Sequence, residues 1–187
     1  MLQIKNVIAE CDDGKHKVRD LSRCNKIIVH RIGPDLGIMT CTSMVDVAKW
    51  MKIHPQESHT GGEMPYTFGI LPTDGTVEQC LELSDVGPHA RRFSTEAVSI
   101  ACLGDFRHME PTLPQWTSLV TICIELCNWM GGGNAMLYGH DELQDASKDK
   151  NKKCPGRYLD MNTLRNEVRL SLVSNGVQGL KAIGVTF

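Results

Sequence analysis

The segment "NKIIVHRIG" (residues 25–33) decides the fold, because it predicts a buried strand around which the rest of the chain can be ordered. Ile27, Ile28 and Val29 form a short apolar run of residues that favour extended structure, and Gly33 ends it. His30 stands near the end of this strand. In α/β proteins the strand ends line the edge of the sheet where ligands bind, so His30 is either a site residue there or a core histidine with its hydrogen bonds satisfied.

Outward from this strand, helical and extended patterns are mixed along the chain. The expected elements are a helix over 42–54 with Thr42 or Ser43 as its N-cap, two strands within 64–83 joined at Asp74-Gly75, a strand over 97–106, a helix over 111–130, a strand over 135–140 and a helix from about Asp160. This mixture predicts an α/β domain with a central sheet and covering helices.

The segment 111–130 is the clearest helix. Thr112 and Gln115 are spaced as a capping box at its start, and the glycines 131–133 end it. The apolar stripe expected to face the core comprises Trp116, Leu119, Val120, Cys123, Ile124 and Cys127.

The composition is typical of one globular domain with no large excess of positive or negative charge. The chain has 187 residues, 41% of them hydrophobic, and a formal net charge of -2. This length can bury a substantial core, and no linker or repeat divides it. The weak net charge argues against a broad basic face for nucleic acid, and the longest apolar run is too short to anchor the chain in a membrane. The first twenty residues lack the apolar region of a secretory signal, which predicts synthesis in the cytoplasm without export by that route.

The eight cysteines predict buried thiols rather than disulfides. Most of them fall in apolar segments, as Cys102, Cys123 and Cys127 do, and free cysteine behaves as a small apolar residue. No C-x-x-C pair is present, which excludes a zinc ribbon and a thioredoxin-type redox site. Cys154 differs from the others because its surroundings are polar.

His140 and Cys154 stand at the two ends of a polar, lysine-rich segment, "HDELQDASKDKNKKC". Like His30, His140 falls at the end of a predicted strand. Zinc is bound by histidine nitrogen and cysteine sulfur, and a catalytic zinc keeps three protein ligands and one open position. His30, His140 and Cys154 are therefore a candidate ligand set. Seven histidines and eight cysteines allow many such triples, so spacing alone leaves a purely structural role open for each residue.

Several segments match one family in the order in which they occur. They are "IIVHRIG", "MPYTFGILPTDGTVEQC", "VGPHA", "SIACLGDF", "LPQWTSL", "LYGHDEL" and "KKCPGRYLDM". This set resembles the zinc-dependent N-acetylmuramoyl-L-alanine amidases, the family of phage lysis amidases and animal peptidoglycan recognition proteins. The resemblance runs from about residue 25 to about residue 170. It implies a single α/β domain with a central mixed β-sheet flanked by helices and a zinc site at the strand-end edge.

The resemblance also implies a domain boundary and a metal site. Residues 1–24 would be an N-terminal extension of unknown role, and residues 25–187 the zinc amidase catalytic domain. One zinc ion would be bound by His30, His140 and Cys154. Zinc there would polarise the amide carbonyl and lower the pKa of a water molecule to about 7.

Three further residues receive roles from the resemblance. Tyr66 falls where these enzymes keep a tyrosine beside the metal, and Lys152 falls where the phage members keep a lysine. Both are expected to donate to the oxyanion that develops during amide hydrolysis. His89 matches the family's Gly-x-His-Ala segment, where it borders the substrate groove, so we expect it to contact substrate.

The implied activity is hydrolysis of the amide between N-acetylmuramic acid and L-alanine in peptidoglycan. Together with the missing secretory signal, it predicts a phage endolysin that is made in the host cytoplasm and acts on the cell wall after release. We expect a monomer with peptidoglycan as its substrate, no nucleic-acid partner and no membrane anchor. One alternative is a recognition module that binds peptidoglycan without cleaving it, although Cys154 and Tyr66 favour catalysis. Another is a structural zinc site, which would need a fourth protein ligand.

Overall fold

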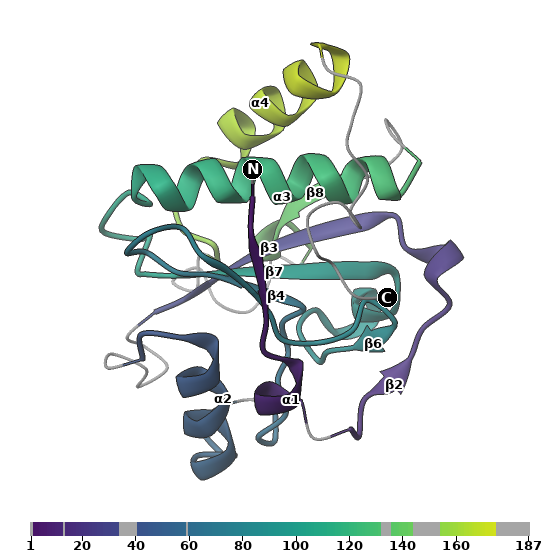
Figure 1. Cartoon of the computed structure of the whole chain (residues 1–187), viewed down its shortest axis with the longest axis vertical. Coiled ribbons are helices and arrows are strands. Elements are labelled where there is room, and N and C mark those ends of the chain that lie inside the picture. The colour runs from purple at the N-terminus through teal and green to yellow at the C-terminus, as the bar shows by residue number, and fades with distance from the viewer. Residues whose placement is uncertain are drawn as a thin grey trace.

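A mixed sheet lies at the centre of the molecule (Figure 1). In the computed structural model, which describes residues 2–12, 14–33, 41–58, 60–131, 136–143 and 154–174, six strands form this sheet in the order β1-β5-β4-β7-β3-β8. They are β1 (Ile4–Asn6), β3 (Lys26–Ile32), β4 (Phe68–Ile70), β5 (Val77–Gln79), β7 (Ala97–Leu103) and β8 (Met136–Gly139). Among the described pairs of this sheet, only β4–β5 is antiparallel. The expected α/β domain with a central mixed sheet is confirmed.

The strand expected at residues 25–33 is β3, and it lies between β7 and β8. It pairs with β7 along its whole length, from Lys26 opposite Ala97 to Ile32 opposite Leu103. Its other edge pairs with β8, which runs in the same direction. Because these three strands are parallel, their carboxyl ends meet at one edge of the sheet, and residues far apart in sequence come together there.

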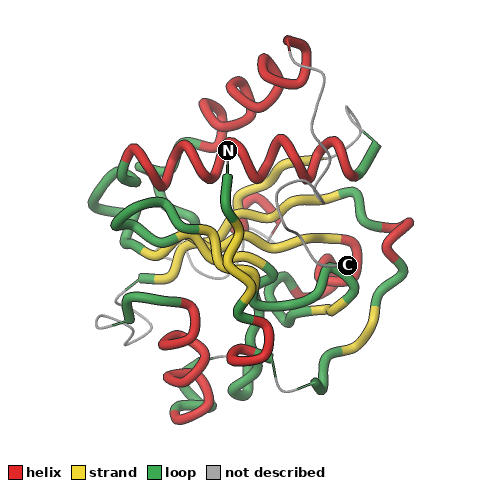
Figure 2. The backbone as a smooth tube through the Cα atoms, in the orientation of Figure 1, coloured by secondary structure: helices red, strands yellow, loops and turns green. Residues whose placement is uncertain are grey.

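Helices cover both faces of the sheet (Figures 1 and 2). Helices α3 (Leu113–Trp129) and α4 (Met161–Ser174) lie over one face, and α1 (Ile8–Cys11) and α2 (Met44–Ile53) lie on the other side. A small antiparallel sheet of β2 (Lys17–Val18) and β6 (Asp85–Val86) and the 3-10 helices η1 (Leu21–Arg23), η3 (Arg91–Glu96) and η4 (His140–Leu143) complete the described elements. Within those residues, no helix combines the length and apolar character that crossing a bilayer requires.

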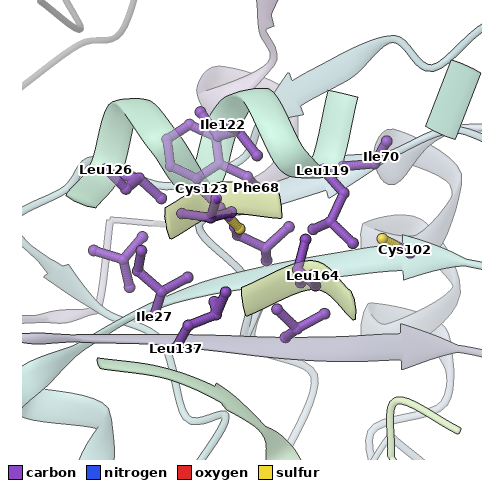
Figure 3. Packing of buried hydrophobic residues seen from close by; sticks show 14 of the residues in the cluster. Ile27, Phe68, Ile70, Cys102, Leu119, Ile122, Cys123, Leu126, Leu137 and Leu164 are labelled. Carbon is purple, nitrogen blue, oxygen red and sulfur yellow. The ribbon is translucent and has the colours of Figure 1, made fainter. Parts of the chain in front are cut away.

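The main core lies between the sheet and the helices α3 and α4. Figure 3 shows Phe68 and Ile70 of β4 pointing into it, together with Leu119 and Ile122 of α3. Leu164 of α4 belongs to the same cluster. All of these side chains are fully buried, so this layer supplies the largest apolar contribution to folding in the described structure.

The start of α3 differs in one respect from the sequence prediction. The Thr112 hydroxyl accepts a hydrogen bond from Gln115 N at 3.3 Å, as the capping box requires. The Gln115 side chain does not return to the N-cap, because its Nε2 donates to the carbonyl oxygens of Ile70 and Leu103. The amide of Gln115 therefore fastens the helix to two strands, and only half of the predicted box forms.

The buried surface of α3 is also wider than the predicted stripe. Ser118, Ile122 and Leu126 are buried, whereas Trp116 is only partly buried. The helix packs on the sheet with one side and on α4 with another, where Trp116 Nε1 donates to Glu167 Oε2 at 3.0 Å. The apolar stripe that the sequence predicts therefore includes residues from two different surfaces of α3, one facing the sheet and one facing α4.

The N-terminal residues take part in the sheet. Strand β1 pairs with β5 and places Lys5 opposite Glu78. The buried Glu78 carboxylate accepts from Lys5 Nζ at 2.8 Å and from Met44 N at 2.7 Å, at the start of α2. One carboxylate thus joins β1, β5 and α2. The domain boundary at residue 24 stays a prediction.

Candidate metal centre

His30 lies on the face of β3 opposite to α3. Alternation along the strand directs Ile27 and Val29 into the core beneath α3, while Ile28, His30 and Ile32 point to the other side. The His30 residue is 2% exposed. A histidine at this depth has few rotamers, so the strand fixes where its ring nitrogens point.

His140 follows β8 directly and begins η4. The turn is held by Glu142, whose carboxylate accepts from Gly139 N at 2.7 Å and forms an ion pair with Arg165 of α4. Gly139 allows a close approach, since a Cβ there would lie 2.8 Å from Pro155 Cδ. The glycine before the histidine therefore lets the segment that contains Cys154 pass directly beside β8.

Cys154 is hydrogen-bonded to η4 and to β3. Its carbonyl accepts from Asp141 N at 2.8 Å, and its Sγ accepts from Arg31 N at 3.4 Å. Two residues later Gly156 has a φ of 116°, and a Cβ at that position would lie 2.6 Å from the Phe106 carbonyl oxygen. Only glycine fits both demands, which explains why glycine follows the Cys-Pro pair.

The three predicted ligands come together at the edge of the sheet. One ligand atom from each of His30, His140 and Cys154 lies within 4.8 Å of the other two. Cys154 Sγ is 3.9 Å from His30 Nδ1, and the two imidazole rings have their centroids 4.4 Å apart. A tetrahedral zinc with ordinary bond lengths separates a nitrogen and a sulfur ligand by about 3.6 Å. The donor types and their spacing therefore fit zinc.

His89 lies beside His30, at the ring nitrogen that does not face Cys154. Its Nδ1 is 3.1 Å from His30 Nε2, and the two rings are nearly perpendicular at 83°. The His89 residue is only 7% exposed. The family resemblance predicts that this side chain contacts substrate, and that role stays a prediction. The structure instead places its ring against a predicted metal ligand, which the sequence pattern did not indicate.

The three histidines at this site have lowered pKa values, which keep them neutral near neutral pH. Burial lowers the pKa of His30 well below 6.5, with smaller contributions from His140 and His89. Burial lowers the pKa of His140 to about 4, and the nearby Arg91 guanidinium adds to this shift. The pKa of His89 is lowered to about 3, again chiefly by burial. Neutral imidazole is the form that binds metal, so near neutral pH the site is ready for a cation.

Tyr66 borders the same group of side chains. Its ring centroid is 5.3 Å from that of His30, and the planes are tilted by 54°. It is 8% exposed, so the residue is largely fixed by its surroundings. Lys152 lies outside the described residues, and its role stays a prediction.

A protein-family model described as N-acetylmuramoyl-L-alanine amidase matches residues 20–157. The chain belongs to this family. The match covers β3, β4, β7, β8 and all three predicted ligands, and it confirms the family that the sequence segments resemble. No sequence among the curated proteins matches this family member.

Solved structures of the same fold come from two kinds of protein. The endolysin N-acetylmuramoyl-L-alanine amidase LysCS from Clostridium intestinale URNW is 22% identical, with a TM-score of 0.67 over 90% of this chain and 97% of the other. The Ph2119 endolysin from the Thermus scotoductus MAT2119 bacteriophage is 18% identical, with a TM-score of 0.66 over 89% and 99%. The Drosophila protein PGRP-LB is 19% identical, with a TM-score of 0.63 over 85% and 91%. At these identities the comparison shows a shared fold.

Proposed function

We propose that this family member is a zinc-dependent N-acetylmuramoyl-L-alanine amidase that cleaves peptidoglycan between N-acetylmuramic acid and L-alanine. The observation that supports the zinc dependence is the meeting of His30, His140 and Cys154 within 4.8 Å at the sheet edge. Three protein ligands leave a fourth position open, which is the arrangement of catalytic zinc sites.

Each ligand is prepared for a cation by its own surroundings. His30 and His140 are held neutral by burial, so neither proton nor charge has to be removed near neutral pH. Cys154 binds metal as a thiolate, and the Arg31 N–H that points at its sulfur stabilises that negative charge. When bound, zinc would polarise the scissile carbonyl and activate water for attack.

Tyr66 and Lys152 complete the proposed catalytic set. The Tyr66 ring lies beside His30, which supports a role for its hydroxyl as a donor to the carbonyl oxygen as charge develops there. Lys152, two residues before Cys154, would add a cationic donor at the same oxygen. Both residues would act on the transition state more than on bound substrate.

We further propose that the protein works as a phage endolysin. Two of the structures that share its fold are described as endolysins. LysCS from Clostridium intestinale URNW is an endolysin N-acetylmuramoyl-L-alanine amidase, and the Ph2119 endolysin comes from a Thermus scotoductus bacteriophage. In that setting the chain would be made in the host cytoplasm and would reach the cell wall after release. We expect it to act there as a monomer.

Mass spectrometry of the products released from purified peptidoglycan tests the activity. We expect stem peptides with a free N-terminal L-alanine when the protein is loaded with zinc, and none after treatment with a chelator. Readdition of zinc should restore release. If the protein pellets with peptidoglycan and releases nothing under any of these conditions, it is a recognition module, a role for which the fold is also suited, since a structure of this fold shows tracheal cytotoxin bound to the peptidoglycan recognition proteins LCa and LCx.

A further inference from the structure

The hydrogen bond between the two buried histidines has a direction that the ligand geometry determines. A neutral imidazole has a proton on only one of its two nitrogens. His30 Nδ1 faces Cys154 Sγ at 3.9 Å, so it must keep its lone pair to bind a metal beside that sulfur. The proton of His30 is then on Nε2, which lies 3.1 Å from His89 Nδ1. His30 therefore donates, and His89 accepts.

We propose that His89 is a positioning residue, which accepts the hydrogen bond that fixes the tautomer and ring orientation of the metal ligand His30. This inference rests on the zinc site proposed above. It departs from the expectation that His89 contacts substrate, because the residue is 7% exposed and its ring is turned edge-on to His30. A side chain so placed has the metal ligand His30 as its direct neighbour, so its first effect is on that ligand.

The backbone around His89 is held firmly enough for this task. His89 N donates to the Gly87 carbonyl at 2.9 Å, and Ala90 N donates to Ser94 Oγ at 2.9 Å. The buried Arg19 guanidinium donates to the Ser94 carbonyl at 3.3 Å. An orienting group is useful only if it is itself oriented, and these contacts fix the short segment from which His89 projects.

The chemical nature of the acceptor matters as well. Many metal-bound histidines are oriented by a carboxylate, which makes the ligand a stronger electron donor. His89 accepts through Nδ1, which requires an uncharged imidazole rather than an anion. Cys154 is then the single anionic group among the three ligands and this acceptor, so a bound divalent zinc retains net positive charge. A neutral acceptor thus orients His30 without weakening the metal as a Lewis acid.

Zinc affinity, measured by competition with a chromophoric chelator at neutral pH, tests the inference without reference to catalysis. His89→Phe keeps an aromatic ring and removes the acceptor, and His89→Leu is a second variant of this kind. Loss of an orienting partner typically weakens metal binding by about 10- to 100-fold, which is the loss expected for both variants. His89→Asn retains an oxygen at the position that Nδ1 holds in histidine, and it should bind zinc nearly as tightly as the wild type.

The outcomes separate this inference from the proposed function. Wild-type zinc affinity in a folded Phe or Leu variant, with a raised KM for peptidoglycan, would overturn the positioning role and restore the substrate-contact role. Equal losses in the Phe, Leu and Asn variants would also overturn it, because the acceptor atom would then not be the determinant. Failure of the wild-type protein to bind zinc at all would instead refute the proposed metal site on which the inference rests.

Discussion

The two faces of the central sheet differ in composition and in purpose. Toward α3 and α4, the strands present Ile27, Val29, Phe68 and Ile70, and that face is apolar. On the other face, the same strand β3 presents His30 between apolar neighbours. A shift of one residue along a strand therefore separates a side chain that stabilises the fold from one that belongs to the metal site.

The second face also buries polar side chains that form hydrogen bonds to the backbone. Ser99 Oγ on β7 accepts from Thr67 N at 2.9 Å and donates to the Pro65 carbonyl at 3.1 Å. These bonds fix the segment that leads into Tyr66. Buried polar contacts of this kind hold a site in one geometry. The apolar face supplies most of the favourable free energy of folding, which offsets the cost of burying polar groups.

The strongest test of this division is Cys154→Ser, which alters the site and leaves the apolar face untouched. Loss of a metal ligand removes several kcal/mol of transition-state stabilisation, so we expect peptide release to fall by about 10³-fold or more. Zinc content should fall with it, while the far-UV circular dichroism spectrum stays unchanged. Cys41→Ser is the matched control and should retain both zinc and activity. An active, zinc-free Cys154→Ser protein would contradict the mechanism.

Phe68→Ala tests the opposite face. Truncating this fully buried ring should lower the free energy of unfolding by about 3–5 kcal/mol, because the cavity closes only in part. Denaturant unfolding measures the change. Leu113→Ala, an exposed position at the start of α3, should change the same quantity by less than about 0.5 kcal/mol. A small effect of Phe68→Ala would show that the apolar face is not the main source of stability.

Tyr66→Phe tests whether a side chain on the second face of the sheet acts in catalysis without binding the metal. Removal of one donor to the oxyanion should lower kcat by about 10²-fold and leave zinc content unchanged. KM should change little, since the contact strengthens mainly in the transition state. Tyr138→Phe, which removes a hydroxyl that donates to Met136 Sδ, is the control for loss of a tyrosine hydroxyl. Unchanged turnover in Tyr66→Phe would remove that residue from the catalytic set.

The smallest effect is expected in the pH dependence of the free energy of unfolding of the metal-free protein. Folding holds the pKa of His140 at about 4 and that of His89 at about 3, whereas both histidines titrate near 6.5 in the unfolded chain. Protonation of the unfolded chain therefore removes stability as pH falls below about 6.5. Each such histidine contributes a slope of about 1.4 kcal/mol per pH unit there. Urea unfolding between neutral pH and the onset of carboxylate titration measures it.

His89→Asn provides the comparison for this slope. The variant has one fewer titrating group, so its stability should decline less steeply with acidification than that of the wild type. Equal slopes in the two proteins would show that His89 is not held neutral by the fold.

Local patterns in the sequence were enough to predict most of the secondary structure. The apolar run at 25–33 gives β3, and the turn at Asp74-Gly75 joins β4 and β5, with Gly75 at a φ of 75°. Gln115 shows where such patterns fail. Its spacing from Thr112 predicts a cap, but its side chain binds two carbonyl groups 45 and 12 residues away. No local pattern contains information about those partners.

Local patterns could not predict the candidate site either, because its residues are far apart in the sequence. His30 and Cys154 are separated by 124 residues, and spacing could not select them from the other histidines and cysteines. The resemblance supplied the ligand set, and the parallel strands explain why its members meet. It did not supply the contact between His30 and His89, because a sequence motif does not reveal which neighbour a buried ring faces.

The backbone bond from Asp141 N to the Cys154 carbonyl has a consequence for how this protein can vary. The bond joins the residue that follows one histidine ligand to the cysteine ligand itself, so a displacement of η4 also displaces the Cys154 backbone. Because His140 and Cys154 then move together, a substitution that shifts the end of β8 should change the distance between these two ligands less than their distances to His30.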